Sequence, residues 1–384
     1  MSPTLQASPK VLVVDLSNYY GGASSRVLSL MARAQPGKIA LAGLEAGAIT
    51  KQARQLDLTV HALGKHKADP RLLFRLIKLI RQECYNVLDS QNIQSKFWAN
   101  LAALATGTSL VSTLNSWYAN EHGKASIKGK IYTSLELTSN QSLDLYITVS
   151  EKDRQSLLKA GLPEDKVELI YNAVDTNLSS IRGDPEWLRQ KFGLPPASVI
   201  CTAVGRLVPV KGYDVLVSAM QRIASQIPQL ICLIVGEGES KEQLSTQIQE
   251  AGLEDRVHLT GYYDRENAMS ILKSSDIFVM PSRYEGTPIA LLEAAALARP
   301  ILASATGGIP ELVQHEKHAF LVPPGDPAAL AQGLMKLSMD RDYARSLGEN
   351  AQRRIQQKFN LVSQFNATWQ AYQKALDKHM LREK

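Results

Sequence analysis

The chain has 384 residues, a formal net charge of +6 and a sequence pI near 9.0. At roughly 100–200 residues per domain, this length predicts two domains, or three at most. A hydrophobic fraction of 45% and a charged fraction of 21% are those of a globular protein, which excludes a disordered chain, a fibre and a polytopic membrane protein. The three cysteines show no metal-ligand spacing, so we expect neither a disulfide framework nor a zinc site.

The basic surplus is confined to the first half of the chain. Residues 1–170 hold 20 Lys and Arg against 14 Asp and Glu, whereas residues 171–384 hold 23 of each. Such a surplus leaves open nucleic acid, an anionic membrane surface or a phosphate-bearing small molecule as partner. Residues 1–9 lack the basic start and apolar stretch of a secretory signal, and no apolar run approaches the ~20 residues of a spanning helix. We therefore expect a soluble, cytoplasmic protein.

Short apolar runs alternate with longer amphipathic segments, which is the pattern of βα units packed into parallel sheets. In the first half, strands are expected over residues 10–16, 39–42, 59–63, 86–89, 109–113 and 145–149. Helices are expected between them, among others over residues 24–34, 71–83 and 95–106. Together these segments predict one doubly wound α/β domain.

The alternation is interrupted once and then resumes. Residues 178–196 are rich in Gly and Pro and are interpreted as a break between domains. Further strands are expected over residues 199–204, 230–235, 257–260, 276–280 and 300–303. Residues 359–384 are helical in pattern, with an apolar stripe expected to pack in a core, namely Phe365, Trp369, Tyr372 and Leu376. Two sheets imply a cleft between two domains, and ligands of open α/β sheets bind beyond the carboxyl ends of the strands.

The segment 280–293 carries the richest set of chemical groups. Glu285 stands in a loop after a strand, and we expect Thr287 to be the N-cap of a helix that starts at Pro288. Free backbone N–H groups at a helix start form a ready site for a phosphate. Glu293 lies further along the same helix, and a carboxylate that accepts from paired hydroxyls suits a ribose or a hexose.

A second loop brings positive charge to the same sheet edge. Arg206 and Lys211 follow the first strand of the second domain. The planar fork of Arg and the point charge of Lys together suit the two phosphates of a diphosphate. In the first domain Gly21-Gly22 follows the first strand, where backbone amides can meet the same diphosphate. The glycine spacing fits neither a dinucleotide fingerprint nor a P-loop, which disfavours a nicotinamide dehydrogenase or an ATPase.

The order and spacing of these segments resemble the retaining glycosyltransferases of the GT-B fold, specifically glycosyltransferase family 4, over nearly the whole chain. The resemblance is carried by Gly21-Gly22 with Arg26, Val149-Ser150-Glu151, residues 171–175, Gly205-Arg206 with Lys211-Gly212, and residues 235–238, 285–293, 307–311 and 321–326. It implies an α/β protein with two Rossmann-like, doubly wound domains that face a central cleft. The implied parts are an acceptor-side domain over residues 1–175, a donor-binding domain over 176–360, and a C-terminal helix over 361–384 that crosses back toward the first domain.

The resemblance also implies roles for the site residues. Arg206 and Lys211 would hold the donor diphosphate, Glu285 would touch the donor sugar, and these three are the expected catalytic residues. Glu293 would receive the ribose hydroxyls. The rest of the expected donor site comprises Gly21, Gly22, Gly286, Thr287, Pro288 and Ile289, with Gly261 and Tyr262 beside the base. No metal or other cofactor is expected, because the family generally needs none for catalysis.

The expected acceptor-side residues are Arg26, Asn115 and His122. Many family members carry a His where this chain has Asn115, and Asn cannot accept a proton, although it can hydrogen-bond a sugar hydroxyl. In a retaining, front-face displacement the leaving diphosphate can take the acceptor proton, so the substitution is compatible with activity. The leading hypothesis is transfer of a hexose from a nucleotide diphosphate sugar, foremost a UDP-sugar, to a saccharide or lipid-linked acceptor in glycolipid, lipopolysaccharide or polysaccharide biosynthesis.

Alternatives remain open at this point. Arg71, Arg75, Lys78 and Arg81 share one helical stripe within residues 71–81, which fits either a peripheral helix on an anionic membrane or a domain helix with a basic polar face. The chain can also be a non-catalytic sugar-nucleotide-binding subunit, or a GT-B sugar-nucleotide epimerase or hydrolase. Nucleic acid is not an expected partner, because aromatic residues make up 6% of the chain and the sequence resembles no nucleic-acid-binding module.

Overall fold

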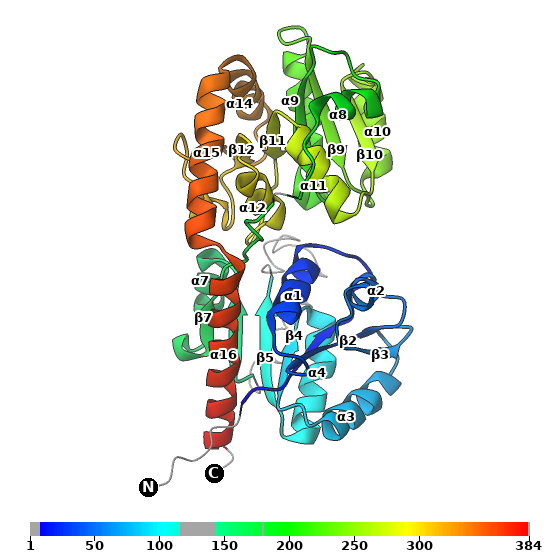
Figure 1. Ribbon diagram of the computed structural model, residues 1–384, viewed down its shortest axis with the longest axis vertical. Helices are drawn as coiled ribbons and strands as arrows, with labels where there is room; N and C mark the ends of the chain where they lie inside the picture. The colour runs from blue at the N-terminus through cyan, green and yellow to red at the C-terminus, as the bar shows by residue number, and fades with distance from the viewer. Residues whose placement is uncertain (1–7, 116–142, 179, 383–384) are drawn as a thin grey trace. The chain divides into compact units, whose positions relative to one another are not determined.

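The computed structural model describes residues 8–115, 143–178 and 180–382 (Figure 1). The chain forms two compact units. Unit 1 comprises Met1–Asn172 together with Leu361–Lys384, and unit 2 comprises Ala173–Asn360. Each unit is built on one parallel β-sheet flanked by helices, as the alternation of apolar and amphipathic segments predicts.

The sheet of unit 1 has seven strands in the order β3-β2-β1-β4-β5-β6-β7. Their bounds are β1 Val11–Asp15, β2 Ile39–Leu44, β3 Val60–Gly64, β4 Val87–Ser90, β5 Ser109–Leu114, β6 Leu145–Thr148 and β7 Val167–Leu169. The described helices include α1 Gly22–Arg33, α2 Ala48–Gln55, α3 Arg71–Glu83, α4 Ile93–Thr106 and α7 Glu151–Lys159. Because the strand order reverses between β1 and β4, the crevice of this sheet lies beyond their carboxyl ends.

The sheet of unit 2 has six strands in the order β10-β9-β8-β11-β12-β13. Their bounds are β8 Val199–Val204, β9 Leu230–Val235, β10 Val257–Gly261, β11 Ile277–Met280, β12 Ile301–Ser304 and β13 Phe320–Val322. The α-helices are α8 Pro185–Phe192, α9 Tyr213–Ile223, α10 Lys241–Glu250, α11 Arg265–Ser274, α12 Ile289–Ala296, α13 Ile309–Leu312, α14 Pro327–Met339 and α15 Arg341–Lys358. Here the order reverses between β8 and β11.

Helix α16, Leu361–Arg382, belongs to unit 1, although the chain reaches it only after unit 2 (Figure 1). Tyr372 and Leu376 lie in one buried cluster with the strand residues Val13 and Val111. Phe365 and Trp369 pack against that cluster. The apolar stripe predicted to pack in a core therefore does so.

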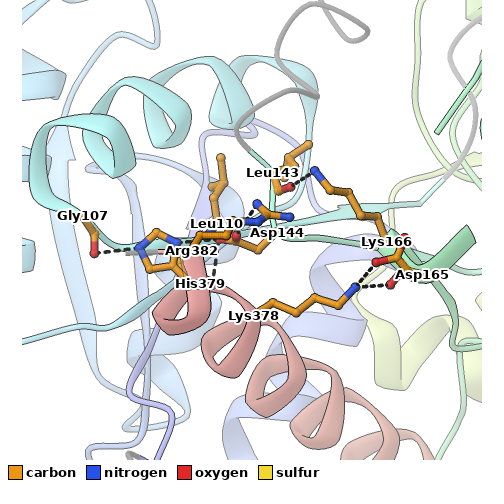
Figure 2. A network of polar contacts seen from close by, with 10 residues as sticks. Gly107, Leu110, Leu143, Asp144, Asp165, Lys166, Lys378, His379 and Arg382 are labelled. Carbon is orange, nitrogen blue, oxygen red and sulfur yellow. Dashed lines mark hydrogen bonds and ion pairs between the residues drawn. The ribbon is translucent and has the colours of Figure 1, made fainter. Parts of the chain in front are cut away.

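A polar network around Asp144 fixes the last turns of α16 (Figure 2). The Asp144 side chain is 1% exposed and accepts from the Ser109 hydroxyl at 3.1 Å and the Leu110 N–H at 2.9 Å. His379 Nδ1 lies 3.1 Å and Arg382 Nη1 lies 3.0 Å from the same carboxylate. One buried carboxylate thus joins the C-terminal helix to β5.

The predicted strands are present with ends shifted by at most two residues, whereas β7, β13 and α8 were missed. Helix α8 lies within the segment interpreted as a break. Asp184 caps this helix by accepting from the N–H groups of Glu186 and Trp187, and Pro185 is its first residue. The residues that indicated a break therefore start a short helix instead.

Candidate active site

Two loops meet where the strand order of unit 2 reverses. The first follows β8 and contains Arg206, and the second covers residues 281–288 after β11. The Arg283 N–H donates to the Val210 carbonyl at 2.7 Å. The Arg283 guanidinium also binds the Asp214 carboxylate through two contacts of 2.7 and 2.6 Å. These bonds fix the two loops relative to each other. A site that orients a ligand requires such a rigid arrangement.

Close backbone packing at this sheet edge requires glycine at two positions. A Cβ on Gly307, where φ is +55°, would lie 1.7 Å from the Glu285 carbonyl oxygen. A Cβ on Gly236 would lie 1.9 Å from the Gly205 carbonyl oxygen. The Gly308 N–H also donates to the Glu285 carbonyl at 3.0 Å. The loops after β9 and β12 can therefore approach the two site loops only because they carry no side chain there.

Lys211 and Glu285 bring opposite charges together across the two loops. Lys211 Nζ lies 2.6 Å from Glu285 Oε1, and the Ser282 hydroxyl donates to the same oxygen at 2.6 Å. The two charged side chains are only 21% and 9% exposed. Burial raises the pKa of Tyr213, Glu285 raises it further and Arg206 opposes both. Arg206 and Glu285 therefore both act electrostatically on the same buried hydroxyl.

The start of α12 adds positive potential at this edge. Its N-cap is Pro288, with ψ at 119°, and no side chain of the described residues caps it. The prediction that Thr287 is the N-cap is therefore wrong by one residue, because Pro288 keeps an extended ψ and the first helical residue is Ile289. The first N–H groups of α12 have no intrahelical acceptor, so they can bind a ligand or water.

Glu293 lies in the second turn of α12 and meets a partner that sequence reasoning missed. Arg265 Nε donates to Glu293 Oε1 at 2.8 Å. Burial raises the pKa of Glu293, and the charge and hydrogen bond of Arg265 oppose that rise. Arg265 is the first residue of α11, where the helix dipole disfavours a cation. That conflict is the one sequence signal that could have singled it out.

The structure brings the predicted donor-site residues of unit 2 to one sheet edge. Gly261, with φ at +82°, ends β10, and the following Tyr262 side chain is 65% exposed. The residues on the loops after β8, β10 and β11 and in α12 are Arg206, Lys211, Gly261, Tyr262, Glu285, Gly286, Thr287, Pro288, Ile289 and Glu293. They supply cations, free N–H groups, carboxylates and an aromatic ring.

Unit 1 holds the remaining predicted residues. Gly21 is the N-cap of α1 and Gly22 is its first residue, so both follow β1 at the crevice of that sheet. Asn115 follows β5, and its Nδ2 donates to the Gln91 carbonyl at 3.2 Å. His122 lies outside the described residues.

Arg26, predicted to lie on the acceptor side, is buried inside unit 1. Its side chain is 4% exposed, and it donates to Asn172 Oδ1 at 3.2 Å and Thr368 Oγ1 at 3.4 Å. Burial lowers the pKa of Arg26, and Tyr372 and Asp89 oppose that shift. Because α16 packs on α1, Arg26 connects elements inside unit 1, and its acceptor-side role stays a prediction.

The interior of unit 1 contains a buried carboxylate, Asp89, with several hydrogen-bond donors around it. Asp89, fully buried, accepts from the hydroxyls of Tyr372 at 2.6 Å and Thr113 at 2.9 Å, and from Gln91 Nε2 at 2.8 Å. Burial raises the pKa of Asp89 to about 6, against these donors and the charge of Arg26, which lower it. The network joins α16 to the strand ends near the crevice of unit 1.

Helix α3 presents a basic surface that includes aromatic residues. Leu72, Leu76 and Ile80 are buried, while Phe74 is 72% exposed. Arg81 also donates to a carbonyl of α4 at 3.1 Å. We name the exposed basic and large apolar residues of both helices the α3–α4 surface: Arg71, Phe74, Arg75, Lys78, Arg81, Phe97 and Leu104. The acidic Glu83 is also exposed, at the end of α3.

Two kinds of feature are missing from the described part of the chain. None of its helices combines the length and apolar character that a bilayer crossing needs. It also contains no cluster of three or more His, Cys, Asp or Glu side chains suited to a metal ion.

Comparisons with known proteins identify the family and the fold. The family model for Glycosyl transferases group 1 matches residues 185–354, and that for Glycosyltransferase Family 4 matches residues 26–178. HepE from Anabaena, solved with UDP and glucose, aligns with a TM-score of 0.82 at 24% identity, over 93% of this chain and 97% of its own. Sucrose-phosphate synthase from Thermosynechococcus elongatus aligns with a TM-score of 0.77 at 21% identity, over 98% of this chain and 100% of its own.

The protein is therefore a glycosyltransferase of the GT-B fold. It belongs to glycosyltransferase family 4, with its second half in the group 1 family. A relative from Escherichia coli, UDP-Gal:alpha-D-GlcNAc-diphosphoundecaprenol alpha-1,3-galactosyltransferase, is 28% identical over 77% of this chain and 76% of its own. A GDP-mannose-dependent alpha-(1-6)-phosphatidylinositol monomannoside mannosyltransferase from Mycobacterium tuberculosis is 32% identical over 53% of this chain and 55% of its own. The chain thus spans about three quarters of the first relative and about half of the second.

Proposed function

We propose that this protein is a retaining hexosyltransferase that uses a UDP-sugar and a saccharide or lipid-linked acceptor in glycolipid, lipopolysaccharide or polysaccharide biosynthesis. The observation that carries the proposal is the cluster of Arg206, Lys211 and Glu285 beside the uncapped start of α12. The name of the Escherichia coli relative supports UDP and a lipid-linked acceptor. The mycobacterial relative is named for GDP-mannose, so the family accommodates other bases.

In this proposal the donor diphosphate lies against Arg206, Lys211 and the first N–H groups of α12. When the bond between the sugar and the diphosphate breaks, negative charge grows on the leaving diphosphate. Fixed cations and backbone dipoles stabilise that charge without reorganising during the reaction. Glu285 binds Lys211 through Oε1, which leaves Oε2 to accept from a hydroxyl of the donor sugar.

The acceptor hydroxyl attacks from the face that the diphosphate leaves, so the configuration of the sugar is retained. Its proton passes to the departing phosphate oxygen, which removes the need for a basic side chain at Asn115. The counter-charge comes from side chains and backbone, and the proposed reaction is therefore metal-independent. Activity that disappears with EDTA and returns with a divalent cation would contradict this part.

Sugar transfer tests the site directly. With UDP-, GDP- and ADP-hexoses and an acceptor panel, Lys211→Ala and Glu285→Ala are each expected to lower kcat/KM by about a hundredfold. Lys336→Ala is the matched control, because Lys336 pairs with Asp340 on the surface of α14. Wild-type transfer rates in both site variants would refute the assignment.

We further infer that the α3–α4 surface rests on an anionic membrane, which would make the protein peripheral to the inner face and bring it to a lipid-linked acceptor. Unit 1, with α16 included, holds 24 Lys and Arg against 16 Asp and Glu, whereas unit 2 holds 19 against 21. The surplus therefore lies wholly in the unit that carries the α3–α4 surface. Basic residues near an anionic surface contribute about 1 kcal/mol each, and exposed aromatic rings add apolar insertion.

Vesicle flotation tests the membrane contact. Wild-type protein is expected to float with vesicles that contain phosphatidylglycerol and not with pure phosphatidylcholine. The double variant Phe74→Ser, Lys78→Glu is expected to stay unbound. Met339→Ser, which removes an exposed apolar side chain of unit 2, is the control and keeps binding. Flotation of the double variant at the wild-type level would rule out the α3–α4 surface.

A non-catalytic sugar-nucleotide-binding subunit is the second candidate, and Asn115 is the residue that favours it. Donor binding without turnover across the acceptor panel would support that function. Conversion of the donor without any acceptor would indicate an epimerase or a hydrolase instead.

A further inference from the structure

The contact between Arg265 and Glu293 leaves hydrogen-bonding capacity unused on both side chains. Helix α12 is apolar apart from Glu293, whose side chain is 12% exposed. Its Oε1 accepts from Arg265 Nε, and its Oε2 accepts no hydrogen bond from the described residues. The Arg265 side chain is 43% exposed, and its Nη groups donate to none of the described residues. The two Nη groups of Arg265 and Oε2 of Glu293 therefore remain available to a bound molecule.

If the ion pair between Arg265 and Glu293 served only to join α11 to α12, it would add little to the stability of the fold. Arg265 stands in the first turn of α11, where the dipole opposes a cation. The Glu293 carboxyl group is buried, and removing a carboxylate from water offsets much of the gain from an ion pair. Apolar side chains can join two helices without that cost. Local arrangements that break such rules concentrate at functional sites.

We propose that Arg265 is a positioning residue for the nucleotide of the donor. It holds Glu293 as an ionised carboxylate whose Oε2 is left for the two ribose hydroxyls, and its own Nη groups donate to the same nucleoside. The inference rests on the donor site proposed above. Tyr262, exposed in the loop that leads into α11, places an aromatic ring three residues before the guanidinium. Ring, guanidinium and carboxylate together match the stacking and hydrogen-bonding needs of a nucleoside.

The role of Arg265 has a consequence for pH. Helices α11 and α15 and strands β11 and β12 pack against α12, and among their described charged groups Arg265 is the one that lowers the pKa of Glu293. Without Arg265, burial raises that pKa unopposed. A protonated Glu293 is a poorer acceptor for a pair of hydroxyls. Nucleotide affinity is therefore expected to fall on acidification. In a variant without Arg265 this loss of affinity is expected to begin at a higher pH than in the wild type.

Calorimetric titration of the full chain with UDP, from about pH 5.5 to about pH 8.5, measures this effect. In Arg265→Gln the Kd for UDP is expected to rise about tenfold at neutral pH, and its further rise on acidification is expected to begin at a higher pH than in the wild type. Arg265→Lys restores the charge without the fork, so it is expected to recover the pH profile but not the full affinity. Arg345→Gln, on the surface of α15, is the matched control and leaves both unchanged.

Glu293→Gln separates this inference from the donor site on which it rests. That variant is expected to lose UDP affinity, and adding Arg265→Gln to it is expected to change little, because the two residues act through one another. Impaired binding in Glu293→Gln with wild-type affinity and pH profile in Arg265→Gln would overturn the role of Arg265 alone. A lowered melting temperature in Arg265→Gln with unchanged UDP binding would likewise reduce the contact to a structural tie. Wild-type UDP binding in both single variants would overturn the donor site as well.

Discussion

The hydrogen bond from Tyr372 to the buried Asp89 supports a stability prediction with a defined pH dependence. The Tyr372 hydroxyl lies 2.6 Å from Asp89 Oδ2, and it is the strongest of the groups that lower the pKa of Asp89 against burial. Tyr372→Phe removes this donor and keeps the ring. Because hydrogen bonds to charged groups contribute about 1.5–3 kcal/mol, we expect the free energy of unfolding of unit 1 to fall by that amount near pH 8.

The sign of the pH effect follows from the direction of the pKa shift. Folding raises the pKa of Asp89 from 3.8 to about 6, so folded unit 1 binds more protons than the unfolded chain within that window. Ionisation of Asp89 therefore lowers stability as the pH rises through the window. Tyr372→Phe raises the pKa of Asp89 in the folded state further. The pH range in which ionisation of Asp89 lowers stability therefore extends to higher pH. Its cost is thus expected to be larger near pH 8 than near pH 5, where a neutral hydrogen bond contributes only about 1 kcal/mol.

Urea unfolding followed by tryptophan fluorescence measures this difference. In a Trp187→Phe background the remaining tryptophans, Trp98, Trp117 and Trp369, all belong to unit 1. Asp89→Asn provides the control, because without the titrating carboxylate Tyr372→Phe is expected to cost the same at both pH values. An equal cost at both pH values with Asp89 intact, or a larger cost near pH 5, would refute the reasoning.

Two further predictions concern packing and anchoring. Gly307→Ala is expected to lower the melting temperature and donor turnover, because its methyl would lie 1.7 Å from the Glu285 carbonyl; Gly325→Ala, also at positive φ but in open space, measures the backbone strain alone. Asp144→Ala is expected to destabilise unit 1 by about 1–3 kcal/mol in urea unfolding, because the buried Leu110 N–H loses its acceptor and Arg382 and His379 lose their partner. Loss of amide protection confined to α16 in hydrogen exchange would locate the effect, and unchanged protection there would contradict it.

The fold, and the meeting of most candidate donor-site residues at one sheet edge, could be predicted because both depend on features that are local in sequence. Buried strands of a parallel sheet appear as apolar runs, and the carboxyl ends of neighbouring strands meet at one edge. Lys211 and Glu285 each follow such a strand, so the contact between them can be predicted once the strand order is known. Helix α8 was missed because it is short, with Leu188 its one buried residue, which gives too few positions for a helical period.

The errors and omissions involve partners that are distant in sequence. The resemblance implied an acceptor-side role for Arg26, but Thr368 of α16, 342 residues later in the chain, covers it. Tyr372 reaches Asp89 across 283 residues, and Arg265 reaches Glu293 across 28. Periodicity indicates that a helix face is buried, but it does not indicate which element buries it. These contacts therefore required the structure.

The distribution of charge leads to a last prediction, on salt dependence. The cations of the proposed donor site, Lys211 and Arg265, each pair with a carboxylate, and unit 2 holds fewer basic than acidic residues. Nucleotide binding would then rest on short contacts and backbone dipoles, which salt screens weakly, whereas attraction of unit 1 to an anionic membrane acts over distances that salt screens strongly. Raising NaCl to about 0.5 M is expected to abolish vesicle flotation and to change the Kd for UDP by less than about threefold. Equal salt sensitivity of the two interactions would show that the basic surplus of unit 1 also acts on the donor.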